Sequence, residues 1–200
     1  NSGTYKYGKE ITSTAMPYIG DEFIGWYSGE ELLSTDATYT FTVDKNVTAK
    51  FAVIEEMSNF NFTSTATACS ITGIKDKTIK EIVVPDYVTF ISQGAFNGCS
   101  SLKNITIPFI GAKAGVTASD TYQYPFGYLF GTSNYTGATA TTQYYYGSST
   151  ISTTSNTYYI PTSLKKVTVT GGDILYGAFY NCSSLTSVEI GDGVTSIGSD

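Results

Sequence analysis

Apolar and polar residues alternate over short stretches along the whole chain, and this period of two predicts β-strands joined by turns. In the first quarter of the sequence the alternation marks four candidate strands, at residues 7–15, 23–27, 39–43 and 47–51. Residues 52–58 follow as a linker that contains two adjacent glutamates. The pattern therefore predicts a small β module, residues 1–51, ahead of a second domain.

A long pattern then occurs twice in the second domain. Residues 94–108 read Gly-Ala-Phe-Asn-Gly-Cys-Ser-Ser-Leu-Lys-Asn-Ile-Thr-Ile-Pro, and residues 177–191 read Gly-Ala-Phe-Tyr-Asn-Cys-Ser-Ser-Leu-Thr-Ser-Val-Glu-Ile-Gly. The segment before it also recurs, because Asp86-Tyr-Val-Thr-Phe-Ile91 returns as Asp192-Gly-Val-Thr-Ser-Ile197. Self-similarity of this length is the sequence mark of a repeat protein.

The spacing of the apolar strands identifies the kind of repeat. Ile82 and Ile105 lie 23 positions apart, and Val167 and Val188 lie 21 positions apart. Leu102 followed by an Ile-x-Ile strand at such spacings is the pattern of leucine-rich repeats. Alternation along the strand predicts that Leu102 and the isoleucines point into a shared core. Residues 60–63 and 69–74 are expected to form a capping hairpin, because a solenoid needs a terminal unit over its open end.

The predicted fold is mainly β, with the N-terminal module followed by a right-handed leucine-rich-repeat solenoid over residues 59–200. Asp200 falls two residues before the next Ala-Phe would be due, so we expect the solenoid to be truncated at its C-terminus and the chain to be a fragment. A long segment, residues 109–160, interrupts the repeats.

This insertion has an unusual composition. Lys113 and Asp120 are its only charges, and Thr, Ser and Gly fill much of it. We expect Phe126, Leu129 and Phe130 to pin it to the solenoid, and residues 136–155 to form an exposed excursion or a hairpin. It contains nine tyrosines: Tyr122, Tyr124, Tyr128, Tyr135, Tyr144, Tyr145, Tyr146, Tyr158 and Tyr159.

Composition narrows the class of partner. The net charge of −6 and a pI near 4.6 argue against nucleic acid and against anionic membrane surfaces. No apolar run approaches the roughly 20 residues that span a bilayer. The number of cysteines is three, which is poor evidence for a disulfide framework. Cys99 and Cys182 share one repeat position, where either buried free thiols or a ladder disulfide would fit.

The sequence offers no catalytic, cofactor-binding or metal-ligating constellation. Histidine is absent, which excludes His-based acid–base catalysis, the Ser-His-Asp and Cys-His systems and the commonest zinc ligand. Glu30-Glu31 and Glu55-Glu56 are adjacent pairs in a turn and a linker, which favours solvated side chains over a glycosidase pair facing one sugar. We therefore expect a protein that is not an enzyme and holds no cofactor.

The N-terminal module resembles a known family. Its Gly25-Trp-Tyr27, Tyr39, Phe41 and closing Ala49-Lys-Phe51 are similar to the divergent internalin-B-type B-repeat, also called the Listeria–Bacteroides repeat. The resemblance covers nearly all of residues 3–51, with Asp21 as a departure where the family often has an aromatic residue. It implies a β-grasp-like spacer of bacterial surface proteins, with no known catalysis.

The repeats resemble the BspA-like leucine-rich repeat, through Ala-Phe-x-x-Cys-Ser-Ser-Leu followed by a strand, Pro or Gly, and Val-Thr-x-Ile. The match covers about residues 60–108 and 161–200. It implies a non-catalytic cell-surface or secreted protein of a gut bacterium, which adheres to host extracellular-matrix or mucosal proteins or to glycans. Two alternatives stay open: an accessory region of a larger surface enzyme, and a purely structural stalk.

Two sets of residues are candidates for ligand binding. Tyr144, Tyr145 and Tyr146 offer large contact area at low entropic cost, although they could simply pack the loop. The outward strand positions could form the recognition surface usual in curved solenoids, or a merely solvated sheet face. These positions are Glu81, Val83, Asn104, Thr106, Lys166, Thr168, Ser187 and Glu189.

Overall fold

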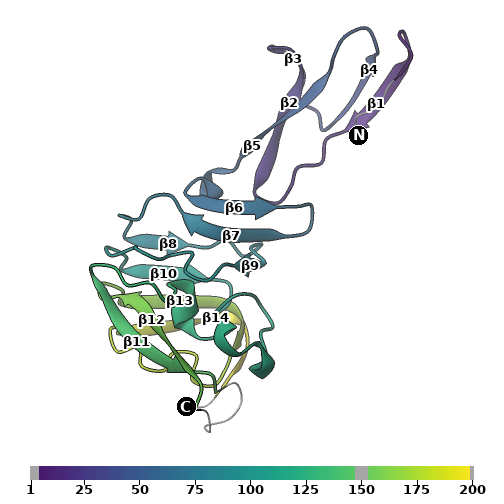
Figure 1. The fold of residues 1–200 in the computed structure, drawn as a ribbon. Helices are drawn as coiled ribbons and strands as arrows, with labels where there is room; N and C mark the ends of the chain where they lie inside the picture. The colour runs from purple at the N-terminus through teal and green to yellow at the C-terminus, as the bar shows by residue number, and fades with distance from the viewer. Residues whose placement is uncertain (1–4, 147–152, 199–200) are drawn as a thin grey trace. The chain divides into compact units, whose positions relative to one another are not determined.

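The computed structural model describes residues 5–146 and 153–198, and the chain divides into two compact units. The first unit is Asn1–Ser58 with Ser64–Thr67, and the second is Asn59–Thr63 with Ala68–Asp200. In the described residues both units consist of β-strands and turns, with short 3-10 segments as the helical structure (Figure 1).

From residue 5 onward, where the structure describes it, the first unit contains five strands in two sheets. Strand β2 lies between β3 and β5 and is antiparallel to both, while β1 pairs with β4. The sequence predicted four of these strands and read Glu31 as part of a turn. The turn is shorter than expected, because Gly29 adopts a left-handed φ of 60° and the chain re-enters the sheet at once. The strands are β1 (Glu10–Thr14), β2 (Asp21–Ser28), β3 (Glu31–Ser34), β4 (Thr38–Thr42) and β5 (Thr48–Val53).

Trp26 is the centre of the first unit. Only 7% of its surface is exposed, and its ring lies 5.7 Å from that of Phe23 and 6.3 Å from that of Tyr39. Its indole N–H donates to the carbonyl of Asp36 at 3.0 Å, as a buried indole requires. The Gly-Trp-Tyr segment thus supplies the main anchor between the two sheets.

The second unit begins with the hairpin expected from the sequence. Strand β6 (Phe60–Ser64) pairs with β7 (Cys69–Ile74), which in turn pairs in parallel with β9 (Phe90–Ile91). The backbone N–H of Lys75 donates to the carbonyl of Asn59 at 2.8 Å and closes the hairpin.

The repeats then form a four-stranded parallel sheet in the order β8, β10, β13, β14. Equivalent positions of successive repeats lie side by side, so that Ile82, Ile105, Val167 and Val188 form one continuous row. This is the arrangement of a solenoid, in which each coil contacts only its neighbours. The strands are β8 (Glu81–Val83), β10 (Asn104–Ile107), β13 (Lys166–Ile174) and β14 (Ser187–Ile197).

The apolar strand positions form the core where coils cover them on both sides. Ile105 and Val167 are 1% and 0% exposed. Val188 and Ile190, at the equivalent positions of β14, are 40% and 43% exposed, because no strand of the described residues pairs on the outer side of β14. Burial therefore depends on the neighbouring coil as well as on the repeat sequence.

The repeated motif places one residue in a left-handed conformation. Gly98 has a φ of 88°, and Asn181, at the same position of the second copy, has a φ of 60°. Glycine adopts this region without cost and asparagine tolerates it better than most residues. The alternation of Gly and Asn at this repeat position therefore has a backbone cause.

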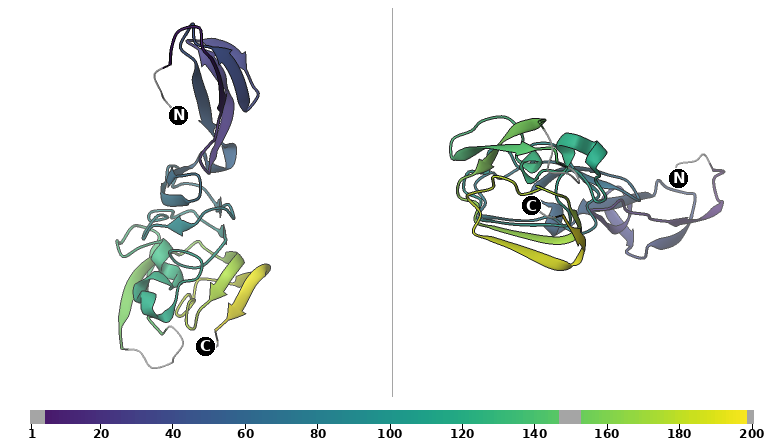
Figure 2. Two further views of the ribbon diagram at one scale, coloured as in Figure 1. Left: turned by 90° about the vertical axis from the view of Figure 1, so that its right-hand side faces the viewer. Right: turned by 90° about the horizontal axis from the view of Figure 1, so that it is seen from below.

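The insertion is folded. It contains the 3-10 segments η2 (Ala118–Gln123) and η3 (Phe126–Leu129), followed by the antiparallel strands β11 (Ala138–Tyr144) and β12 (Ser155–Pro161). Of the two arrangements expected for residues 136–155, the structure has the hairpin, with residues 147–152 outside the described part. The views of Figure 2 show this hairpin on the side of the second unit opposite β13 and β14.

Both copies of the repeated motif bind the insertion. In the first copy, the N–H groups of Gly94 and Phe96 donate to the carbonyls of Tyr128 and Leu129 at 2.9 and 3.0 Å. In the second, the carbonyl of Ala178 accepts the N–H of Phe126 at 2.8 Å. The three apolar residues expected to pin the insertion (Phe126, Leu129 and Phe130) are all 0% exposed.

Candidate ligand-binding surfaces

Four tyrosines gather at the end of the β11–β12 hairpin, and we call them the tyrosine cluster: Tyr144, Tyr146, Tyr176 and Tyr180. Ring centroids lie 5.5 Å apart for Tyr144–Tyr146, 5.6 Å for Tyr144–Tyr180, 5.3 Å for Tyr146–Tyr176 and 5.8 Å for Tyr146–Tyr180. The last three contacts are edge-to-face, a preferred geometry for aromatic pairs. Tyr180 is 38% exposed and the other three are partly buried.

Only part of this cluster could be found from the sequence. Tyr144 and Tyr146 belong to the predicted Tyr144–Tyr146 run. Tyr176 and Tyr180 follow β13, Tyr176 directly before the second motif copy and Tyr180 within it. Tyr145 lies apart from the cluster, with side-chain hydrogen bonds to Tyr158 and Asn156. Alternation along a strand would have separated Tyr145 from its two neighbours, but no local pattern pointed to Tyr176 or Tyr180.

Gln143 fixes the strand that carries Tyr144. This side chain is 0% exposed. Its Oε1 accepts the N–H of Gly127 at 2.7 Å, and its Nε2 donates to the carbonyls of Ala178 and Tyr180, each at 3.0 Å. A buried amide with its donors and acceptor used stabilises the arrangement without a desolvation penalty. The insertion and the second motif copy are thereby held together beside the cluster.

Gly177 provides the space for one ring of the cluster. A Cβ at this position would lie 2.6 Å from Cδ2 of Tyr146, and the residue has a left-handed φ of 65°. Gly94 is the equivalent residue of the first motif copy. It has a φ of 71° and approaches the backbone of Gly131 instead of a tyrosine ring. The repeat glycine therefore lets the insertion approach both copies closely.

The Tyr146 phenol of the cluster is uncharged near neutral pH. Partial removal from water raises the pKa of the Tyr146 phenol, and the neighbouring phenols of Tyr180, Tyr144 and Tyr176 raise it further. Neutral phenols can both donate and accept hydrogen bonds. The cluster can therefore offer apolar ring faces and hydroxyl groups to an uncharged ligand.

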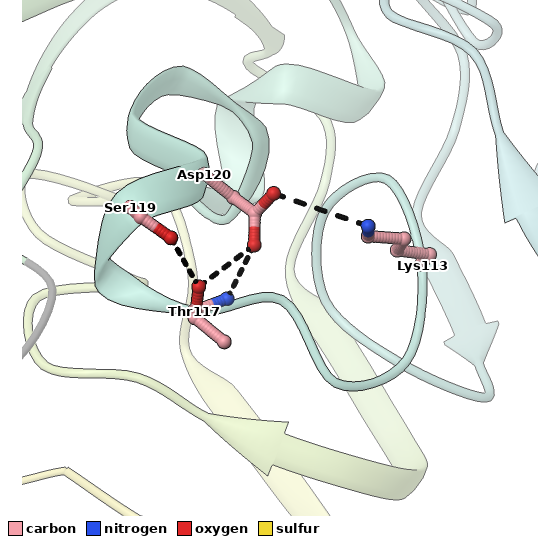
Figure 3. Close-up of polar contacts among 4 residues, drawn as sticks. All are labelled: Lys113, Thr117, Ser119 and Asp120. Carbon is pink, nitrogen blue, oxygen red and sulfur yellow. Dashed lines mark hydrogen bonds and ion pairs between the residues drawn. The ribbon is translucent and has the colours of Figure 1, made fainter.

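The two charges of the insertion neutralise each other (Figure 3). Thr117 donates its backbone N–H and its hydroxyl to Asp120 Oδ2 at 2.8 and 3.0 Å, and Lys113 Nζ lies 3.9 Å from Asp120 Oδ1. The backbone bond is the largest cause of a lowered pKa of the Asp120 carboxyl, followed by the hydroxyl and, less strongly, Lys113. Since Thr117 and Asp120 form the capping box at the start of η2, the Asp120 carboxyl has a structural role.

The second candidate surface is the outward row of the parallel sheet, and it is partly self-paired. In the register, Asn104 lies beside Glu81 and Lys166, while Thr106 lies beside Thr168. Lys166 Nζ lies 2.7 Å from Glu189 Oε1, and Thr168 donates to Glu189 Oε2 at 3.4 Å. The Lys166 bond is the largest cause of a lowered pKa of the Glu189 carboxyl. The predicted residues thus lie in one row, but the charges of Lys166 and Glu189 in that row are paired with each other.

The motif cysteines are free thiols. Cys99 is 0% exposed, and burial raises its pKa to about 11. Cys182 is less completely covered, and burial raises its pKa to about 12. The coil of β13 separates the coils that carry the two residues, so their positions do not favour the ladder disulfide. Both thiols remain protonated near neutral pH and are poor nucleophiles.

The described part of the chain has neither a metal-binding cluster nor a membrane-spanning helix. Residues 5–146 and 153–198 contain no group of three or more His, Cys, Asp or Glu side chains that could hold a metal ion. They also contain no helix that is long and apolar enough to cross a membrane.

Comparison with protein-family models gives two matches. Residues 1–55 match a divergent InlB B-repeat domain, and residues 40–114 and 152–200 match a BspA type leucine rich repeat region in six copies. The second match covers more than half of the chain and omits most of the insertion. No curated protein and no solved structure matches the chain.

Proposed function

The chain belongs to the BspA-type leucine-rich-repeat family and begins with a divergent InlB B-repeat domain, and from this premise we propose that it is a bacterial surface or secreted adhesion protein. In this proposal it binds an extracellular protein or glycan and performs no catalysis. The module over residues 1–51 would be a spacer, residues 52–58 a linker and residues 59–200 the binding domain. Host matrix or mucosal molecules are the proposed partners.

The tyrosine cluster is the observation that supports this proposal best. Its rings contact one another, so little side-chain entropy is lost when a ligand packs on them. The cluster consists of tyrosines alone, and the only two charges of the insertion are paired with each other. These features favour an uncharged partner, either the apolar face of a sugar or a neutral peptide segment.

The outward row of the sheet is a second candidate. Its Lys166–Glu189 pair would need to be broken to bind a charged group, and an exposed pair of this kind is weak because water and salt screen it. Glu81, Asn104 and Thr106 lie further along the same face and could donate or accept hydrogen bonds. A purely structural stalk would use neither surface, whereas an accessory region of a larger surface enzyme would have catalysis elsewhere in that protein.

A binding screen tests the proposal. The purified chain is applied to arrays of neutral and sialylated glycans and of host matrix proteins, and each signal is repeated with Tyr144→Ser/Tyr146→Ser. The expected result is loss of the signal, while Tyr7→Ser, which alters an 84%-exposed tyrosine of the first unit, retains it. Binding that survives the double change would refute the role of the cluster.

Two further variants separate the surfaces. Tyr145→Ser should retain binding if the cluster alone contacts the ligand, because Tyr145 lies apart from it. Lys166→Ala/Glu189→Ala should also retain binding unless the outward row is the contact surface. If binding is lost only with Lys166→Ala/Glu189→Ala, the ligand contacts the outward row of the sheet and not the cluster.

A further inference from the structure

The tyrosine cluster joins two segments that are far apart in the sequence. Tyr144 and Tyr146 end the β11 side of the hairpin, and Tyr176 and Tyr180 follow β13. Three ring contacts cross between the segments at 5.3 to 5.8 Å, with interplanar angles of 75° to 80°. This edge-to-face packing brings phenol rings of the two segments into contact, and phenols couple through the ring carbons next to the hydroxyl group.

We propose that the cluster is an oxidative cross-linking site, at which Tyr144 or Tyr146 couples to Tyr176 or Tyr180 to give dityrosine. This reactivity goes beyond the proposed adhesion function and does not depend on it. Each phenol gives up one electron and one proton to a one-electron oxidant of the haem peroxidase class. The two phenoxyl radicals then join through the ring carbons next to their hydroxyl groups, and both rings recover their aromaticity as those carbons lose their protons to the hydroxyl oxygens. Hydrogen peroxide accepts the two electrons and two protons, its O–O bond breaks, and two water molecules form.

Exposure and neighbours distinguish the cluster from other tyrosines. Tyr180 is 38% exposed, so an oxidant can reach it from solvent. Its ring centroid lies 5.6 Å from that of Tyr144 and 5.8 Å from that of Tyr146. Tyr158 is 0% exposed and beyond the reach of an external oxidant. Tyr122 and Tyr128 are also near each other, at 6.2 Å, but Tyr128 is only 4% exposed. The cluster thus combines access with a partner on a separate segment.

The cross-link would change the stability of the insertion. It would covalently tie the β11–β12 hairpin to the turn after β13, where Gln143 already holds the two together by hydrogen bonds. Closing a loop reduces the conformational freedom of the unfolded chain, so the melting temperature of the second unit should rise. It would also fix the ring positions on the surface proposed to bind ligand.

The experiment uses the whole chain at low concentration, with a haem peroxidase and limiting hydrogen peroxide. Monomer is separated by size exclusion, and its dityrosine fluorescence and mass are measured. The expected product is a monomer that has lost two hydrogen atoms, with a peptide containing Tyr144 and Tyr146 joined to one containing Tyr176 and Tyr180. Its melting temperature, followed by tyrosine circular dichroism, should exceed that of untreated protein.

Variants that keep the rings provide the controls. Tyr176→Phe/Tyr180→Phe retains the aromatic packing but removes both phenols of one segment, so the intrachain product should be lost. Tyr7→Phe removes an 84%-exposed phenol outside the cluster and should leave the yield unchanged. Dityrosine found only in covalent dimers, or an unchanged yield of intrachain dityrosine in the double variant, would overturn the proposal.

Discussion

Replacing Gln143 with Met tests the main connection between the insertion and the repeats. Met has a similar length and volume, so the change removes the hydrogen bonds while leaving little empty space. The N–H of Gly127 loses the partner that it has at 2.7 Å, and a buried N–H left unpaired costs about 1–3 kcal/mol. The carbonyls of Ala178 and Tyr180 each lose one bond, at about 0.5–1.5 kcal/mol per bond.

The expected loss is therefore about 3 kcal/mol in the free energy of unfolding of the second unit. The three bonds set the upper end at about 6 kcal/mol, and two features lower it. The carbonyl of Ala178 still accepts the N–H of Phe126, and Met is easier to bury than an amide.

Urea denaturation measures this change, and the chain has a convenient set of probes. Its single tryptophan, Trp26, belongs to the first unit, so its fluorescence reports that unit alone. Near-ultraviolet circular dichroism reports the tyrosines, most of which lie in the second unit. The midpoint should fall in the tyrosine signal of Gln143→Met and stay constant in the tryptophan signal.

Gln93→Met is the matched control, because Gln93 is exposed and the change should alter stability by less than about 0.5 kcal/mol. If Gln143→Met unfolds at the same urea concentration as Gln93→Met, the buried amide does not stabilise the insertion and the reasoning is refuted.

Three other predictions concern the repeat motif and the sheet. Cys99→Ser should lower the free energy of unfolding by about 1–3 kcal/mol, because it buries a hydroxyl. Native Cys99, with a pKa raised to about 11, should resist maleimide labelling at neutral pH, and rapid labelling would contradict its burial. Asn181→Ala should lower the free energy of unfolding by about 1–2 kcal/mol, whereas Asn181→Gly should lower it less, because the φ of 60° suits glycine. Equal losses of the two variants in urea denaturation would argue against a backbone cause. The pKa of Glu189 is lowered by Lys166, so the pair stabilises the fold above the ordinary value of 4.5 and this stabilisation is lost as the pH falls below it. Glu189→Gln should therefore show a smaller drop in melting temperature between neutral and acidic pH, and an unchanged drop would exclude a contribution from the pair.

The repeat architecture could be read from the sequence because its determinants are local and recur. The Ile-x-Ile strands alternate with a period of two, and the motif returns with Gly, Ala, Phe, Cys and Leu in register. Both predicted family resemblances are confirmed, as is the mainly β solenoid. The short strand at Glu31–Ser34 was missed because two adjacent glutamates and a glycine are typical of turns.

The degree of burial, in contrast, was decided by tertiary structure. Val167 and Val188 occupy the same repeat position, yet one is 0% and the other 40% exposed, because only Val167 has a strand on both sides. Gln143 reads as a polar residue of an exposed hairpin, yet it is fully buried among backbone groups of the second motif copy. No pattern along the chain contains the information about what covers a residue.

The candidate binding surface shows the same division. The sequence alone marked the Tyr144–Tyr146 run, since aromatic residues are conspicuous in a segment with almost no charge. It did not connect this run with Tyr176 and Tyr180, because their contact depends on how the hairpin docks on the turn after β13. Local alternation and recurrence therefore determined the scaffold, whereas contacts between distant segments, which no local pattern encodes, determined the cluster.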